Sequence, residues 1–169
     1  LDIKDANGNL VRTFSSLRDS LFQEHAGGPP AEPVLTKEKG INRFVWNLRY
    51  PTISGITGTY MEASFRGHKA SPGKYSAVLI SGAQKLSVNF QILPNPLYAA
   101  DSKTYQEYHT TMLGMETEIS RMHKLVTSLH EKQLQLDKII ESLPAESKFE
   151  NLKQEGNTLS TRMKQWDED

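Results

Sequence analysis

"KYSAVLISGAQKLSVNFQILPNP", residues 74–96, contains the pattern that decides the fold. In its second half, apolar and polar residues alternate; the apolar members are Leu86, Val88, Phe90 and Ile92. A period of two places the two sets on opposite faces of an extended chain and indicates a half-buried strand. Gly82 and Ala83 separate this run from the apolar run before it, as in a tight turn. The stretch therefore predicts an antiparallel hairpin that ends at the prolines.

The chain before this hairpin also predicts short strands joined by turns. In "LDIKDANGNLVRTF", residues 1–14, Asn-Gly stands between two short β-type runs, which is a strong local signal for a hairpin. Residues 15–40 include "HAGGPPAEP" and predict an exposed loop, and residues 51–71 predict a loop with one strand at "TYMEASF". Five or six strands punctuated by turns are typical of a small antiparallel sandwich. We expect an immunoglobulin-like β-sandwich over residues 1–96.

"GINRFVWNLRYP", residues 40–51, is the richest stretch in aromatic and basic side chains. Alternation predicts a strand with Phe44, Trp46 and Leu48 on its inner face, opposite the strands that carry Leu79 and Phe90. Arg43 and Arg49 would then point outward, to hydrogen-bond neighbouring loops or an adjacent domain. In the alternative interpretation, Trp46 and Tyr50 form a stacking platform for a sugar.

After the prolines the period changes from two to alternating three and four, which is a heptad pattern. Its members are Tyr105, Tyr108, Met112, Met115, Ile119, Met122, Val126, Leu129, Gln133, Leu136, Ile140 and Leu143. Pro144 ends this helix, and a second seam follows at Phe149, Leu152, Gly156, Leu159, Met163 and Trp166. The pattern predicts helices at about 102–143 and 146–166, with Asp101 or Ser102 as the N-cap. Together, residues 97–169 should form a coiled-coil-like antiparallel hairpin, which makes the chain an α+β protein.

The two predicted helices differ in length, which leaves part of the first seam without a partner. Folding back about Ala145 and Glu146 pairs Leu136 with Gly156 and Val126 with Trp166. Residues 105–125, roughly 30 Å of helix, remain uncovered. An apolar stripe of this length needs a partner: a second copy, the sandwich, or a segment beyond Asp169. The predicted interaction surface is Tyr105, Tyr108, Met112, Met115, Ile119 and Met122, with Arg43 and Arg49.

Composition excludes several classes of function. The chain has 20 basic and 20 acidic residues, so no net field attracts nucleic acid or an anionic membrane. It has no cysteine, which removes disulfides and thiolate chemistry. No apolar run is long enough to span a bilayer. The first residues resemble the middle of a strand, so we expect a piece of a longer polypeptide.

No residue pattern indicates catalysis, a cofactor or a metal. Acidic residues in the first half are sparse and unpaired, whereas glycoside hydrolysis needs two carboxylates at a set separation. His25 and His68 are interpreted as lone loop residues. His109, His123 and His130 are placed on a solvated or interface face of the long helix. A phosphate-binding glycine loop is also missing.

Four stretches resemble, in order, the C-terminal region of bacterial sortilin-like BNR-repeat β-propeller proteins, which usually carry the label of glycosyl hydrolases. These are "LDIKDANGNLVRTF", "GINRFVWNLRYP", "SPGKYSAVLISGAQKLSVNFQIL" and "PNP". The first three are also similar to immunoglobulin-like domains of the flagellar hook-capping type. Asn47 replaces the Asp of the usual pattern, and Pro94-Asn95-Pro96 replaces Asp-Pro. The resemblance implies an extracytoplasmic parent of Bacteroidetes type and an accessory role for this piece.

We therefore expect a non-catalytic scaffold region that docks on the parent's propeller or on a second copy. The alternative is a carbohydrate-binding module, since small sandwiches often carry exposed aromatic rings that stack on sugars. Its candidate residues are Tyr50, Tyr60 and Phe65. Exposure of two of these rings would favour the alternative, and polysaccharide would then be the ligand.

Overall fold

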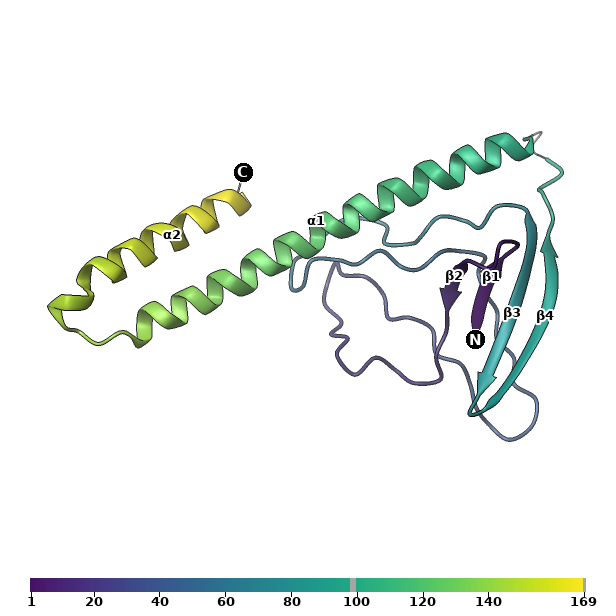
Figure 1. Ribbon diagram of the computed structural model, residues 1–169, viewed down its shortest axis with the longest axis horizontal. Coiled ribbons are helices and arrows are strands. Elements are labelled where there is room, and N and C mark those ends of the chain that lie inside the picture. Colours follow the sequence, from purple (N-terminus) through teal and green to yellow (C-terminus); the bar gives the residue numbers. More distant parts are fainter. Residues whose placement is uncertain (98–99, 169) are drawn as a thin grey trace. The chain divides into compact units, whose positions relative to one another are not determined.

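The computed structural model describes residues 1–97 and 100–168 and shows an α+β protein (Figure 1). Its elements are β1 (Asp2–Asp5), β2 (Leu10–Thr13), β3 (Gly73–Ser81), β4 (Gln84–Ile92), α1 (Ser102–Ser142), a 3-10 turn (Ser147–Phe149) and α2 (Glu150–Glu168). The chain forms two compact units, Leu1–Ser120 and Arg121–Asp169. The boundary between them falls inside α1, so the first turns of this helix belong to the same unit as the strands.

The strands form one antiparallel sheet in the order β2-β1-β3-β4. Both predicted hairpins are present. At the first turn, Gly8 takes a φ of 83°, and the Asp5 carboxylate accepts hydrogen bonds from the backbone N–H groups of Asn7 and Asn9. Gly82 takes a φ of 56° in the second turn. A left-handed residue suits tight hairpin turns, which explains why these glycines locate them correctly.

The strands predicted over residues 40–51 and at "TYMEASF" do not form. Between Phe14 and Pro72 the described chain is irregular, with one isolated bridge between Arg49 and Lys69. Around residues 46–49, local side-chain hydrogen bonds replace the backbone hydrogen bonds that a strand would make. Trp46 Nε1–H donates to the Arg49 carbonyl, and Asn47 Oδ1 accepts from the Arg49 N–H. Leu48 between them has a φ of 58°, which no regular strand allows.

The irregular segment nevertheless covers one face of the sheet. The core is Ile3, Val11, Phe14, Ala70 and Tyr75, and Leu35, Phe44, Trp46 and Tyr50 pack against it. Trp46 meets Tyr75 and Phe90 edge to face, with ring centroids 6.1 and 6.2 Å apart. The inward positions of Phe44 and Trp46 are thus confirmed, although Leu48 is exposed.

Helix α1 begins at its predicted first residue and ends one residue before its predicted last residue. Asp101 caps it, because its carboxylate accepts a 2.7 Å hydrogen bond from the Thr104 N–H. The helix ends at Ser142, before Pro144. The second helix starts later than expected, since Ser147–Phe149 form a 3-10 turn.

In the second unit, α2 contacts the last part of α1. Gly156 lies against Ile140 and Leu136, the latter a predicted neighbour. Ser160 is buried and donates a 2.6 Å hydrogen bond to Asp137, which also accepts one from Gln133. These hydrogen bonds lower the pKa of Asp137 and keep its carboxylate ionised.

The two helical glycines should respond differently to alanine. A Cβ on Gly114 meets nothing within 4 Å, whereas one on Gly156 comes within 2.9 Å of Ile140. Gly114→Ala should raise the free energy of unfolding by about 1 kcal/mol through helix propensity alone. Gly156→Ala should gain less, because Ile140 must shift. Urea unfolding followed by far-UV circular dichroism measures both, and equal gains at the two positions would contradict the packing.

Candidate functional site: a buried histidine network on helix α1

His68 is buried where two loop segments run side by side. The Tyr50 N–H donates to the His68 carbonyl at 2.9 Å, and the Ala70 N–H donates to the Leu48 carbonyl at 2.7 Å. A Cβ on Gly67 would overlap the carbonyl oxygens of Tyr50 and Pro51, so only glycine permits this approach. The paired segments direct the His68 side chain toward α1, where it is fully buried.

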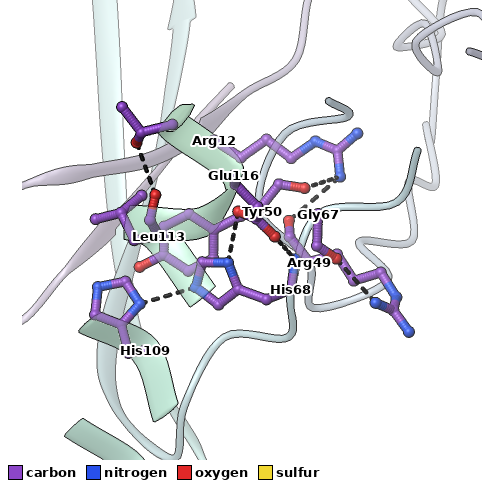
Figure 2. Close-up of polar contacts among 9 residues, drawn as sticks. Arg12, Arg49, Tyr50, Gly67, His68, His109, Leu113 and Glu116 are labelled. Atoms are coloured by element: carbon purple, nitrogen blue, oxygen red, sulfur yellow. Dashed lines mark hydrogen bonds and ion pairs between the residues drawn. The ribbon is translucent and has the colours of Figure 1, made fainter. Parts of the chain in front are cut away.

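Both ring nitrogens of His68 and its backbone N–H meet side chains of α1 (Figure 2). Nδ1 lies 2.8 Å from Glu116 Oε2, and Nε2 lies 2.8 Å from Nδ1 of His109. The His68 N–H donates to Glu116 Oε1 at 2.6 Å. The Tyr50 ring stacks on the imidazole, with centroids 4.1 Å apart and planes 10° apart. One loop residue is thus fixed to two residues of α1, which we call the histidine network (His68, His109 and Glu116).

Burial shapes the electrostatics of the network. Burial raises the pKa of Tyr50 to about 12, so its phenol stays neutral. Burial, and then the nearby His68, lower the pKa of His109, while the carboxylates of Asp5 and Glu116 oppose this shift. Neutral rings satisfy every contact. His68 then donates from Nδ1 to Glu116 and accepts at Nε2 from the Nδ1–H of His109.

Arg12 of β2 ties the loop beneath the network to the sheet. Its guanidinium is buried and donates from Nη1 to the carbonyls of Arg49 and Tyr50, at 3.3 and 3.0 Å. Nη2 binds Glu32 at 2.5 Å. Burial tends to raise the pKa of Glu32, but hydrogen bonds from Thr52 and Arg12 leave it lowered. Polar contacts therefore run without a break from β2, through residues 49–50 and His68, to α1.

The predicted interaction surface on α1 separates into two columns of heptad spacing. Tyr105, Met112 and Ile119 are half-buried, and His109 and Glu116 lie on the same side of the helix. Tyr108, Met115 and Met122 are exposed, by 40, 55 and 52 per cent. We call these three residues the exposed column. Within the first unit, the strand and loop region thus covers Tyr105, Met112 and Ile119 and leaves Tyr108 and Met115 exposed.

The other predicted site residues are scattered. Arg43 is exposed, while Arg49 is half-buried and donates to the Gly67 carbonyl at 2.8 Å, as expected of a loop-bonding arginine. Phe65 is buried, and Tyr50 is half-buried with one face against His68. Tyr60 alone of the three candidate sugar-binding rings is mostly exposed, by 70 per cent. Two exposed rings, which would have favoured the carbohydrate-binding alternative, are therefore not found among Tyr50, Tyr60 and Phe65.

Sequence reasoning missed the histidine network. The interpretation of His68 as a lone loop residue is wrong, because its ring contacts that of His109, which lies on a face of α1 in contact with the loop. One signal was present: His109 and Glu116 are seven residues apart and share the side of Tyr105, Met112 and Ile119. Their partner His68, however, is 41 residues away from His109, beyond the reach of any local pattern.

Chemically, the network is a short proton-sharing chain in which every nitrogen of His68 has a partner. Within residues 1–97 and 100–168, no three His, Asp or Glu side chains are grouped to hold a metal ion. An open hollow of about 370 Å³ lies elsewhere, lined by Met61, Phe65 and Arg66 among others. The geometry is that of a structural contact that holds a loop against a helix.

Comparison with protein-family models, curated proteins and solved structures finds no match. The side-chain geometry and the sequence therefore carry the functional argument. In the described part of the chain, no helix combines the length and apolar character required to cross a membrane.

Arg12→Lys should destabilise the first unit by about 2 kcal/mol, because one ammonium group cannot replace the forked contacts to two carbonyls and Glu32. Arg43→Lys, at an exposed position, is the matched control and should change stability by less than about 0.5 kcal/mol. Urea unfolding followed by Trp46 fluorescence, in a Trp166→Phe background, measures both. Equal effects would show that Arg12 does not anchor the loop.

Proposed function

We propose that the chain is a non-catalytic scaffold region of a larger extracytoplasmic β-propeller protein, and that it mediates docking or self-association through helix α1. The observation that carries the proposal is the exposed column. Tyr108, Met115 and Met122 lie seven residues apart on one helix, and each is at least 40 per cent exposed. Exposed apolar side chains repeated on one side of a helix are typical of surfaces that bind another protein.

The second unit also exposes apolar side chains. Leu125, Leu134 and Ile139 of α1 are each more than half exposed, as are Leu152 and Leu159 of α2. Methionine suits such a surface, because its flexible thioether adapts to the partner's shape. The histidine network supports the same role, since it fixes the first turns of α1 while leaving the exposed column accessible.

In this proposal the first unit is of the immunoglobulin-like sandwich type, with its second layer reduced to the segment around Trp46. The helices form a coiled-coil-like hairpin, supported by heptad spacing and by the contact of Gly156 with Ile140. The propeller parent, its glycosyl hydrolase label and the extracytoplasmic location rest on the sequence resemblance. The partner is the parent's propeller or a second copy of the chain.

The alternative, a carbohydrate-binding module, rests on Tyr60 alone. Its ring packs against Gly27, a residue that lines the open hollow described above. One exposed ring beside an open hollow is a weaker basis for polysaccharide binding than two coplanar rings. Retardation by a polysaccharide in affinity electrophoresis, abolished by Tyr60→Ala, would establish this function instead.

The docking proposal predicts that the chain self-associates, or binds its parent's propeller, through the exposed column. Sedimentation velocity from low to high micromolar concentration, without and with the propeller, measures both. Met115→Lys with Met122→Lys should weaken the association at least tenfold, about 1.4 kcal/mol. Lys124→Glu, an exposed charge change on the same helix, is the control. The proposal would be contradicted if the chain stayed monomeric, did not bind the propeller and did not bind a hydrophobic dye.

A further inference from the structure

The contact between His68 and His109 depends on protonation in a way that the scaffold role does not require. A hydrogen bond between two imidazole nitrogens 2.8 Å apart needs one proton between them, no more and no less. His68 Nδ1 must also carry a proton, because it faces the carboxylate of Glu116 at 2.8 Å. Two neutral rings meet both conditions.

A first extra proton leaves the contacts intact. It can sit on His68, which then donates from both nitrogens, to Glu116 and to His109. It can also sit on the outer nitrogen of His109. A second extra proton is different: both facing nitrogens then carry hydrogen, and two positive rings lie with centroids 5.1 Å apart. Two N–H donors then face each other with no acceptor between them, and the two positive charges repel, so the rings must separate.

We propose that His68 and His109 form a pH-sensitive latch, which holds residues 102–120 of α1 on the strand region (residues 1–97) in neutral solution and releases them in mildly acidic solution. The latch stands on the geometry of the two rings and is independent of the docking proposal. Its release would free the half-buried column of Tyr105, Met112 and Ile119.

The surroundings of the two rings favour release on acidification. From α1, Glu116 and the Tyr108 ring face His68, and from the loop, the Tyr50 ring lies over both imidazoles. Tyr50 is uncharged and offers no compensation. Asp5 of β1 and Glu116 attract a proton to His109, but burial and His68 outweigh them, so the pKa of His109 is lowered. Among residues 1–97 and 100–168, the carboxylate of Glu116 is the one that contacts the pair directly.

The sign of the effect follows from linkage. His109 binds a proton less readily in the folded chain than in the unfolded chain, whose pKa is about 6.5. Above that pH neither form is protonated, and the docked helix keeps its full stability. As pH falls below 6.5, the undocked form can take up one proton on each ring, whereas the docked pair keeps its contacts with only one extra proton. Docking therefore weakens by up to about tenfold per pH unit.

Hydrogen exchange of the amides of residues 102–120 tests the latch in the full chain. Between about pH 7.5 and 5.5, where model carboxylates remain ionised, protection corrected for intrinsic exchange should fall by up to about tenfold. His109→Gln keeps an N–H donor for His68 and removes the titrating ring, so its protection should not depend on pH. His25→Gln, in the loop before Gly28, is the control and should behave as the unmodified chain.

Histidine NMR titration of the unmodified chain gives a second measurement that needs no variant. Uptake of the second proton by the two rings and the loss of protection should share one midpoint. Unchanged protection down to pH about 5.5 would overturn the latch. Equal pH dependence in the unmodified chain and in His109→Gln would also overturn it. If His109→Gln does not fold, the shared midpoint decides, and two unrelated midpoints reject the proposal.

Discussion

The first unit depends on the fixation of one buried imidazole. An imidazole removed from water costs about 1–3 kcal/mol for each hydrogen bond that it fails to make. His68 avoids this cost because both ring nitrogens have partners, Glu116 and His109, and its own N–H reaches the same carboxylate. A slide of α1 by one turn would break all three contacts. Polar contacts of this kind allow only one position of α1 relative to the loop, whereas apolar packing alone would allow several.

The alignment set by His68 determines which side of α1 is covered. With His109 and Glu116 turned toward the loop, the column of Tyr105, Met112 and Ile119 is half-buried, and the exposed column lies to one side. Arg12 fixes the loop itself, since it binds the carbonyls of Arg49 and Tyr50 from the sheet. The orientation of α1 and the latch therefore depend on the same contacts. The same two histidines that orient the helix can also release it.

Features determined by neighbouring residues could be predicted from the sequence. The hairpins at Gly8 and Gly82 and the bounds of α1 follow from turn chemistry, capping and heptad spacing. Residues 40–51 show the limit of this reasoning. Alternation placed Phe44 and Trp46 inward correctly, but it could not reveal that Leu48 takes a left-handed conformation. Side-chain bonds to the local backbone replaced the ladder.

The candidate site could not be predicted, because its members are distant in sequence and polar. An apolar heptad count passes over His109 and Glu116, although both lie on the covered side. It also cannot bring His68 to them, since that approach requires the close contact of Gly67 with the Tyr50 carbonyl. Half of the predicted interaction surface is covered by this chain's own strand and loop region, one of the partners that the sequence left open.

The most direct measurement is a double-mutant cycle between His68→Asn and Glu116→Gln, with free energies of unfolding of the first unit from urea denaturation. A buried pair that orients the helix should show a coupling free energy of about 1.5 kcal/mol or more. Amide protection of residues 102–120 should fall in both single variants. A coupling near zero, with the helix still protected, would show that α1 is held by apolar packing alone and would contradict the account.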